Sequence, residues 1–242
     1  MPVVAFRAPA RRRLHEDVAE QLRDAILDGR FAAGRKLPPE RELAQEFGVN
    51  RTSVREALKV LEGLGLVTVR QGDGATVRPV VDASLELLGP MIFHGGRVDL
   101  GLVAEMAEVL RPMLREMGRL AITRCRPADL AAIRGLRDVV ADGTRDREMR
   151  FRALHDLLVV LADTTRNRVW QMVARRLRRL FRQEPLTAAR TRLRRDPGRF
   201  VPHIDACLDA LDQKRHADAA AALDRLIAVL ANFQKPHGGT RR

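Results

Sequence analysis

The stretch Leu37–Leu66, LPPERELAQEFGVNRTSVREALKVLEGLGL, contains two short helical patterns separated by Gly48-Val49-Asn50. The apolar positions spaced to share one face of each helix are Leu43, Ala44 and Phe47, followed by Val54, Ala57, Leu58 and Leu61. Asn50 stands where an N-cap residue belongs, because its side-chain oxygen can accept from a free backbone N–H of the next turn. The stretch therefore predicts two consecutive helices joined by a tight turn.

The start of the second helix carries a polar face made of Arg51, Thr52, Ser53 and Arg55. A helix with hydrogen-bond donors at its N-terminus and an apolar back has the properties needed to enter the major groove of DNA. The alternative is an ordinary helical hairpin with a solvated basic face. The flanking segments favour the DNA-reading interpretation.

These flanking segments complete a winged helix-turn-helix pattern. Residues 66–70 alternate like a strand, residues 71–74 (QGDG) have the composition of a turn, and residues 75–77 return as a second strand. Upstream, apolar residues recur at helical spacing from Leu14 to Ile26, and Gly29 ends that helix. The expected order over residues 14–78 is three helices followed by a hairpin.

The same segment resembles the GntR family of bacterial transcription regulators. The resemblance is carried by Gly29-Arg30-Phe31…Gly34…Leu37-Pro38-Pro39-Glu40-Arg41-Glu42-Leu43-Ala44…Gly48-Val49-Asn50-Arg51…Val54-Arg55-Glu56-Ala57-Leu58…Leu61…Gly65-Leu66. Pro39 and Asn50 depart from the family, which usually has a small hydroxyl residue at the first position and Ser or Thr at the second. Losing a hydroxyl cap at Pro39 is expected to cost the following helix up to about 1 kcal/mol, partly offset because proline is tolerated at a helix start.

The resemblance implies a homodimer that binds a near-palindromic double-stranded DNA operator. It assigns the DNA contacts to Arg41, Asn50, Arg51, Thr52, Ser53 and Arg55, with Gln71 and Gly72 of the wing in the minor groove. Two recognition helices would enter major grooves about one turn (~34 Å) apart. Arg51 and Arg55 are expected to read guanine, because a guanidinium fork matches the O6 and N7 acceptors.

A chain of 242 residues is long enough for two domains, each with its own core. It contains no apolar run near the ~20 residues needed to span a bilayer, and an amphipathic helix follows Arg11-Arg12-Arg13 where a signal peptide would be apolar. Cys125 and Cys207 lack CxxC or zinc-finger spacing and are expected to be reduced thiols. These features predict a cytoplasmic protein without a membrane partner.

The formal net charge of +13 is unevenly distributed. Residues 1–78 contain 14 Lys and Arg against 11 Asp and Glu, whereas residues 79–242 contain 30 against 20. Most of the positive excess therefore lies outside the DNA-reading segment. Residues 1–13 are expected to form a disordered basic arm that adds phosphate contacts, and residues 235–242 a disordered tail.

The rest of the chain is expected to be helical. Glycine and proline interrupt residues 79–99, which are predicted to be a linker with one short helix. Residues 100–234 show successive amphipathic helical patterns without convincing period-two alternation, and Pro112 predicts a kink near Leu110. The predicted fold class is mainly α, with an N-terminal winged helix-turn-helix and a C-terminal all-α helical bundle.

This arrangement resembles the FadR-like branch of the GntR family, in which an FCD-type helical domain senses a small molecule and supports the dimer. The resemblance rests on helix order and on Leu120-Ala121…Pro127-Ala128-Asp129-Leu130 and Asn167-Arg168-Val169-Trp170. It implies that residues 100–234 form an effector-binding and dimerisation domain.

Many members of that branch hold a metal ion with an Asp four residues before a His, plus two later histidines. Here Phe151 stands four residues before His155, His203 could match one later histidine, and Arg225 and Leu226 stand near the position of the last. Two neutral imidazoles make a poor site for a divalent ion, so no metal or other cofactor is predicted. Because no catalytic motif is present either, the chain is not expected to be an enzyme.

Residues 175–195 contain nine arginines and a single acid. Arg176 falls within the apolar stripe of the helix that contains it, and a charged side chain directed at a core needs a counter-charge. An internal carboxylate would supply one. In the alternative, Arg176 with Arg111 or Arg115 binds the carboxylate, phosphate or thioester end of an effector. His155 and His203 are further candidates for the effector pocket.

The predicted function is sequence-specific transcription regulation, most often repression in this family, controlled by a small anionic effector such as an acyl-CoA or another carboxylate. One alternative is a nonspecific or architectural DNA-binding protein whose basic helical surface wraps the duplex. Another is a helical interaction module that retains an idle winged helix. Neither alternative explains an arginine in an apolar stripe as well as a sensor does.

Overall fold

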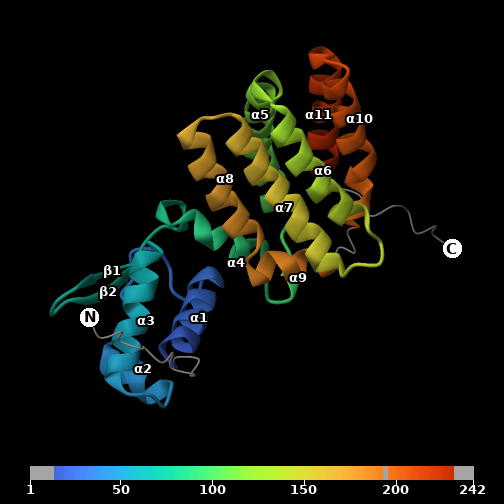
Figure 1. Cartoon of the computed structure of the whole chain (residues 1–242). Coiled ribbons are helices and arrows are strands. Elements are labelled where there is room, and N and C mark those ends of the chain that lie inside the picture. Colours follow the sequence, from blue (N-terminus) through green and yellow to red (C-terminus); the bar gives the residue numbers. More distant parts are fainter. Residues whose placement is uncertain (1–13, 193–195, 232–242) are drawn as a thin grey trace, which may run out of the picture. The chain divides into compact units, whose positions relative to one another are not determined.

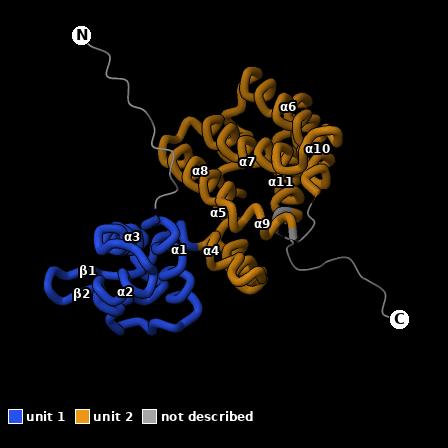
Figure 2. The backbone as a smooth tube through the Cα atoms, turned by 90° about the horizontal axis from the view of Figure 1, so that it is seen from below, with its two compact units in different colours: residues 1–87 blue, residues 88–242 orange. Residues whose placement is uncertain are grey.

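The computed structural model describes residues 14–192 and 196–231, and the chain divides into two compact units, residues 1–87 and 88–242 (Figure 2). The first unit contains α1 (Leu14–Leu27), α2 (Glu40–Glu46), α3 (Arg51–Gly63), β1 (Val67–Arg70) and β2 (Gly74–Val77), followed by single 3-10 turns at Val80–Asp82 and Leu85–Leu87. The predicted basic arm at residues 1–13 and tail at residues 235–242 lie outside the described residues.

The core of the first unit forms where α1 and α2 both pack against α3 (Figure 1). Val54 and Leu61 of α3 are completely buried, as expected from their helical spacing. Leu22 of α1 and Leu43 of α2 complete this core. The packing fixes α3 by its apolar back and leaves the opposite face of its first turn in solvent.

The hairpin expected after the third helix is formed by β1 and β2. The strands pair antiparallel, with Val67 opposite Val77 and Arg70 opposite Gly74. Val67 and Val77 are buried, which anchors the base of the hairpin to the core. A further bridge joins Thr76 to Lys36, so the loop before α2 also pairs with the outer strand.

Gly65 makes the sharp turn from α3 into the hairpin. Its φ is +74°, a left-handed conformation that L side chains rarely adopt. A Cβ at this position would lie 3.1 Å from the carbonyl oxygen of Asp82 and 3.2 Å from Cα of Ala83. Glycine is therefore required both by the backbone conformation and by the close approach of the following segment.

The second unit is a helical bundle that also contains one very short hairpin. Its elements are α4 (Leu88–Ile92), β3 (Phe93–His94), β4 (Arg97–Val98), α5 (Leu100–Arg124), α6 (Pro127–Ala141), α7 (Arg147–Thr164), α8 (Arg168–Phe181), α9 (Glu184–Arg192), a 3-10 turn at Pro197–Phe200, α10 (Val201–Asp212) and α11 (His216–Ala231). Helix α7 packs against α5, α6 and α8, while α11 packs against α5 and α10 (Figure 1). The mainly α fold class is confirmed.

The segment predicted as a linker contributes to the second unit. Ile92 is buried in a cluster with Val103 and Leu180, and Phe93 packs against the same cluster. Gly89 lies inside α4, where a Cβ would meet the side chain of Gln183, so this glycine permits close packing. The hairpin of β3 and β4 in this segment was not predicted, because its strands are two residues each and too short to show alternation.

The predicted apolar stripe of α8 was wrong in part; it comprises Val169, Met172, Val173, Leu177, Leu180 and Phe181. Leu180 is buried as expected and Ala174 is buried as well, whereas Val169 is 68% and Met172 72% exposed. Trp170 and Leu177 pack with Ala174 against α5 and α7. The sequence offers two apolar faces, and packing selects the one on which small Ala174 allows close contact with α7. Arg176 consequently lies on the exposed side of the helix and does not enter the core.

One further feature of the bundle differs from expectation. Helix α9 was not predicted, because its composition is rich in arginine and threonine and its apolar residues are few. Its Leu186 and Ala189 are nevertheless buried, so the helix is held by tertiary contacts. Helix α5 includes Pro112 and continues as one helix from Leu100 to Arg124.

Candidate nucleic-acid interface and helical-unit cavity

Helix α3 begins at a capped N-terminus. The side-chain oxygen of Asn50 accepts a hydrogen bond of 2.8 Å from the backbone N–H of Ser53, which confirms the predicted N-cap. Arg51 and Thr52 are exposed and Ser53 is half-buried. The first turn therefore presents one long cationic and two short hydroxyl side chains from a rigid helix end, as base recognition requires.

Arg55 is held by Glu40, a partner that no sequence pattern indicated. Its Nε and Nη2 donate to the carboxylate of Glu40, with the shortest contact, 2.8 Å, from Nη2 to Oε2. Glu40 begins α2, so the ion pair joins the starts of both helices of the helix-turn-helix. Arg41, the next residue on α2, is exposed. Pro39 at the N-cap of α2 makes no side-chain capping bond, as expected from its chemistry.

The wing is fixed to the rest of the unit by two polar contacts. The backbone N–H of Val69 donates to Oε1 of Glu62 on α3 over 2.8 Å. At the tip, Asp73 forms an ion pair with Lys36, which lowers the pKa of that carboxyl group. Gln71 and Gly72 are exposed in this turn, and Gly72 has a φ of +79° that favours glycine. Lys36 and Glu62 were not singled out from the sequence, because their partners are distant along the chain.

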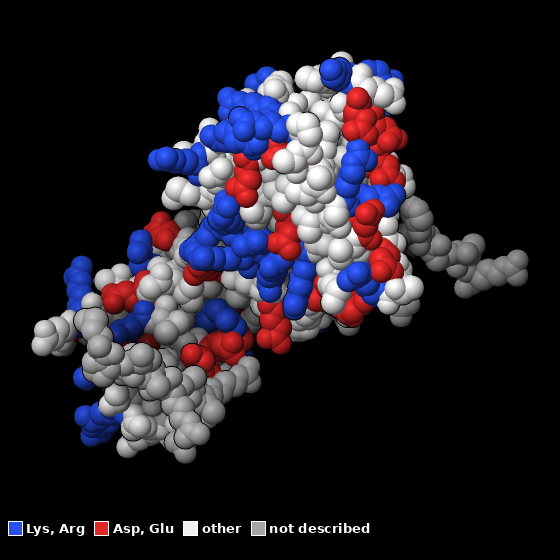
Figure 3. All heavy atoms as spheres, viewed as in Figure 1, with Lys and Arg blue, Asp and Glu red and all other residues white. Residues whose placement is uncertain are grey.

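Basic side chains also gather over the surface of the second unit around α8, interspersed with acidic ones (Figure 3). Arg175 pairs with Asp163 at 3.0 Å, and Arg178 and Arg182 both pair with Asp156 at 3.0 and 2.8 Å. Part of the excess positive charge of this unit is therefore paired with carboxylates of α7. These ion pairs contribute to the contact of α7 with α8 and with the residue that follows it.

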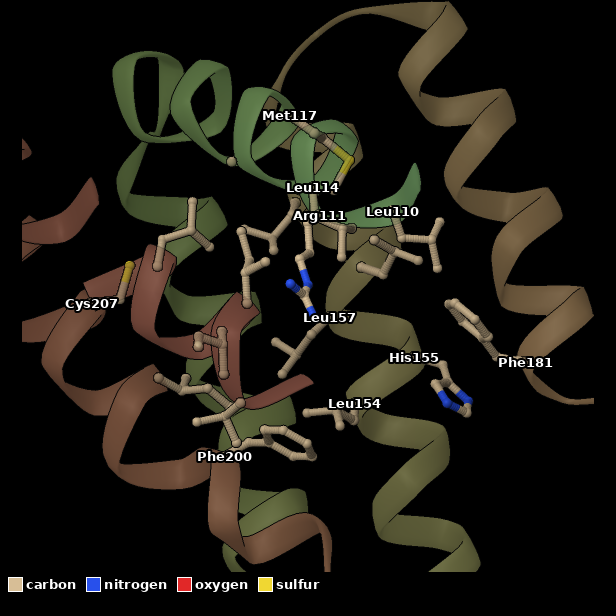
Figure 4. Close-up of a pocket in the computed structure, with 18 of the residues that line it drawn as sticks. Leu110, Arg111, Leu114, Met117, Leu154, His155, Leu157, Phe181, Phe200 and Cys207 are labelled. Atoms are coloured by element: carbon tan, nitrogen blue, oxygen red, sulfur yellow. The ribbon is translucent and has the colours of Figure 1, made fainter. Parts of the chain in front are cut away.

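The second unit encloses a cavity of about 250 Å³. Apolar side chains from α5, α7, α10 and α11 form most of its wall, among them Leu114, Leu157 and Phe200 (Figure 4). The polar exceptions are Arg111, Cys125, His155, Thr164, Arg190, Arg199 and Cys207. None of the described lining residues is an Asp or a Glu. The described lining is thus mostly apolar, with several cationic side chains and no carboxylate of its own.

The two thiols expected to be reduced both line this cavity and are free. Burial raises the pKa of Cys207 to about 11, and it also raises the pKa of Cys125. Both side chains are therefore neutral thiols near pH 7, and they add to the low polarity of the wall.

The five side chains predicted for an effector site do not all lie together. Arg111 and His155 line the cavity, and Arg111 projects from α5 toward Leu157 (Figure 4). Arg115 instead donates from Nε to Asp224 of α11 over 2.7 Å and lies outside the lining. His203 is half-buried on α10 and is also outside the lining. Arg176 lies on the exposed side of α8, as described above.

His155 lies between two aromatic rings, with centroids 6.5 Å from Phe151 and 5.5 Å from Phe181. Burial, with Arg190 and then Arg182 nearby, lowers the pKa of His155 to about 3. The imidazole is therefore neutral at physiological pH. Its Nδ1 is buried and has no hydrogen-bond partner among the described residues. His155, which the sequence offered as a candidate for the effector pocket, thus lies in the cavity wall.

The surroundings of His155 do not fit a metal ion. Among the described residues, no group of three or more His, Cys, Asp and Glu side chains could hold one. The phenyl ring of Phe151 supplies no donor atom, and the guanidinium group of Arg190 lies 5.1 Å from the centre of that ring. A divalent ion here would lack ligands and would be repelled by the neighbouring cation.

Arg190 is a cavity residue that sequence reasoning counted among nine arginines but did not distinguish. Its Nη1 donates to the carbonyl oxygen of Phe181 over 2.7 Å, and its Nη2 donates to Thr187 over 2.8 Å and to Glu148 over 3.3 Å. Burial lowers its pKa, while Glu148 acts in the opposite direction. Its Nε is buried without a partner among the described residues. Arg190 lies on α9, so its position could not be predicted while that helix was missed.

Family models match both units of the chain. The model described as "Bacterial regulatory proteins, gntR family" matches residues 14–77, and the FCD domain matches residues 105–229. Among the residues that the structure describes, no helix combines the length and apolar composition required to cross a bilayer.

Relatives support the same assignment. An uncharacterised HTH-type transcriptional regulator of Mycobacterium tuberculosis is 36% identical over 196 residues, which cover 76% of each chain. The HTH-type transcriptional regulator Mce2R of the same species is 40% identical over 125 residues, 51% of this chain and 52% of that one. The HTH-type transcriptional repressor NanR of Klebsiella aerogenes is 46% identical over 80 residues, 33% of this chain and 31% of that one.

A solved structure has a similar fold. This protein is Lar, which controls the expression of the Listeria monocytogenes agr system. It is 17% identical, and the match covers 94% of this chain and 96% of that one, with a TM-score of 0.60. The families and relatives are transcriptional regulators and not enzymes. The chain belongs to the GntR family of bacterial regulatory proteins and is a transcriptional regulator whose helical unit is an FCD domain.

Proposed function

We propose that the protein is a homodimeric, cytoplasmic repressor that binds a specific DNA operator and responds to a small anionic effector. The exposed, capped start of α3 supports the operator-binding part of this proposal. The base and backbone contacts are assigned to Arg41, Asn50, Arg51, Thr52, Ser53, Arg55, Gln71 and Gly72. Repression is favoured because NanR, which matches a third of the chain, is named as a repressor.

The observation that carries the effector part is the cavity in the second unit. It is lined by apolar and cationic side chains, and none of its described lining residues is acidic. A wall that combines apolar and cationic side chains favours an anionic ligand with an apolar part over a neutral or cationic one. An acyl-CoA or another carboxylate has the required combination of a negative group and apolar surface. Arg111 and His155 are retained as effector residues, whereas Arg115, Arg176 and His203 lie outside the cavity lining.

Effector control requires two states of the dimer that differ in operator affinity. A ligand shifts their balance only if it binds one state more tightly than the other. The proposal is that the filled cavity favours the state in which the two recognition helices do not fit successive major grooves.

Fluorescence anisotropy with duplexes from the protein's own upstream region tests the proposal. The wild type should bind one duplex at least 10³-fold more tightly than a scrambled duplex at physiological salt, in the range typical of specific regulators. A panel of carboxylates and acyl-CoAs should then include a compound that weakens this binding. Equal affinity for both duplexes with a steep salt dependence would instead support the nonspecific DNA-binding alternative.

A further inference from the structure

The cavity wall restricts the chemistry of its ligand. Leucine, isoleucine, methionine and phenylalanine side chains form most of the lining, and the thiols that interrupt them are neutral. Hydroxyl groups of a polyhydroxy acid would lose their hydrogen bonds to water without replacement along this wall. An aliphatic chain would lose nothing and would gain from burial of its methylene groups. The volume of about 250 Å³ exceeds that of an apolar protein cavity of ~150 Å³ known to bind benzene.

One part of the wall has unused polar capacity. Nε of Arg190 and Nδ1 of His155 are both buried and without hydrogen-bond partners among the described residues. The two groups share one neighbour, because the guanidinium carbon of Arg190 lies 5.1 Å and the ring centroid of His155 6.5 Å from the centroid of Phe151. Buried polar groups in proteins are nearly always hydrogen-bonded. Two buried nitrogens without described partners, both beside the phenyl ring of Phe151, therefore indicate a place for a ligand acceptor.

The chemistry of the missing partner follows from these two nitrogens. Nε of Arg190 can only donate, because a guanidinium group has no acceptor. His155 is neutral, so its Nδ1 donates when the proton is on that nitrogen and accepts when it is on Nε2. A carboxylate satisfies both nitrogens with its two oxygens when Nδ1 of His155 carries the proton. Arg190 keeps its Nη1 and Nη2 contacts, which hold Nε in place without ligand.

The positions of Arg190 and His155 allow a ligand carboxylate to be bound without a metal ion. Phe151 stands four residues before His155, where the related proteins that hold a metal have an Asp. Arg190 lies over that phenyl ring from α9 and pairs through Nη2 with Glu148 at 3.3 Å, which leaves its Nε for a further acceptor. A ligand carboxylate can therefore be bound by a side chain of the protein itself, without a metal ion.

We propose that Arg190 and His155 form a metal-independent subsite for the carboxylate of an aliphatic acid whose hydrocarbon chain lies in the apolar cavity. This inference rests on the proposed effector response and specifies its ligand class and head-group contacts. Arg111 on α5 is a second cation of the same cavity and orients the acid from the other side of the wall.

Sodium decanoate in the presence of EDTA is the first probe. Trp170 is the single tryptophan of the chain and packs against Met117 and Leu158, which line the cavity, so its fluorescence reports occupancy. Decanoate should bind saturably and raise the thermal unfolding midpoint, and EDTA should not change its Kd. Decan-1-ol and decyltrimethylammonium should bind at least tenfold more weakly. Equal binding of decan-1-ol, or binding that requires a divalent ion, would overturn the subsite.

Substitutions locate the head group. Arg190→Met should weaken decanoate binding by about 10- to 100-fold, the effect typical of losing a hydrogen bond to a charged group. Arg175→Met removes an arginine that pairs with Asp163 outside the cavity lining and should bind decanoate like the wild type. His155→Phe keeps the aromatic contacts, removes Nδ1 and should weaken binding by about threefold to tenfold. If Arg190→Met does not fold by circular dichroism, Arg190→Lys and His155→Phe provide the test, and wild-type affinity in both contradicts the proposal.

The same variants separate the subsite from the proposed function. Their unliganded operator affinity should equal that of the wild type, because the cavity lies in the second unit. If other anions alter operator binding while decanoate does not bind, the subsite is wrong and the proposed function stands. If decanoate binds but no compound of the panel alters operator affinity, the proposed effector control fails.

Discussion

Arg55 at the start of α3 donates two hydrogen bonds to the carboxylate of Glu40 at the start of α2, from Nε and Nη2. The contact spans 15 positions in sequence and orients a guanidinium group that is proposed to read a base. We therefore expect Glu40 to act on DNA recognition by fixing the direction of Arg55, while its own charge opposes approach to phosphates.

Glu40→Gln should lower the specificity of DNA binding. Affinity for a scrambled duplex should rise because one negative charge is removed, while the ratio of operator to scrambled affinity should fall because Arg55 is no longer oriented. The thermal unfolding midpoint should change little, since exposed ion pairs contribute little to stability. Glu56→Gln removes the same charge from α3 but leaves the Arg55–Glu40 pair intact, so it should increase both affinities together. An unchanged specificity ratio in Glu40→Gln would show that Arg55 orients itself.

Arg55→Ala should weaken operator binding by about 5- to 150-fold and relax the preference at one base-pair position of each half-site, as expected for loss of a bidentate contact. Lys59→Ala, on the C-terminal half of the same helix, should leave base preference unchanged. Anisotropy titrations with operators substituted at each position measure both effects. Equal losses on all sequences would reassign Arg55 to a phosphate contact.

Asn50→Ala should destabilise the first unit by about 0.5–2 kcal/mol, because the N–H of Ser53 loses its capping acceptor. Asn50→Ser should restore most of that stability, since a serine hydroxyl can cap the same helix. Amide hydrogen exchange in α3 measures the difference without requiring the two units to unfold together. Equal protection in Asn50→Ala and wild type would show that the cap does not contribute.

Gly65→Ala should destabilise the first unit by about 1–3 kcal/mol. The change forces a side chain into a left-handed backbone conformation and places Cβ 3.1 Å from the carbonyl oxygen of Asp82. Gly63→Ala provides the matched control, because that glycine is helical and its Cβ would meet no atom within 4 Å. It should be neutral or stabilising by up to about 1 kcal/mol. Thermal unfolding followed by circular dichroism compares them, and similar midpoints would contradict the strain argument.

Stability should fall at acidic pH through His155. Its pKa is lowered to about 3 in the folded protein, so between pH 3 and the ordinary value of 6.5 the unfolded chain binds a proton that the folded chain does not. Above pH 6.5, burial of the neutral imidazole therefore does not lower the free energy of unfolding. At pH 5 it lowers the free energy of unfolding by about 2 kcal/mol. His155→Phe removes this contribution and should give a shallower loss of unfolding midpoint between pH 7 and 5. Parallel profiles for wild type and variant would show that His155 is solvated.

The sequence by itself determined the DNA-reading unit, because its signals are local. The helical spacing of apolar residues predicted the buried face of α3, and Asn50 predicted where the helix begins. The QGDG segment predicted the turn between β1 and β2. Each of these depends on residues within a few positions of one another, where backbone geometry limits the alternatives. The family resemblance rests on the same short spacings and was confirmed by the match over residues 14–77.

Tertiary structure decided the features that join distant residues. Helical periodicity predicted that Arg176 lies within the buried face of α8. In the structure, the face that contains Ala174 packs against α7, and Arg176 is exposed. Arg190 entered the cavity wall because α9, which has little helical signal of its own, is held by burial of Leu186 and Ala189. Which arginine faces a cavity depends on the rotation of a helix about its axis, and that rotation is fixed by neighbouring helices. The Glu40–Arg55 pair and the setting of His155 between Phe151 and Phe181 arise in the same way.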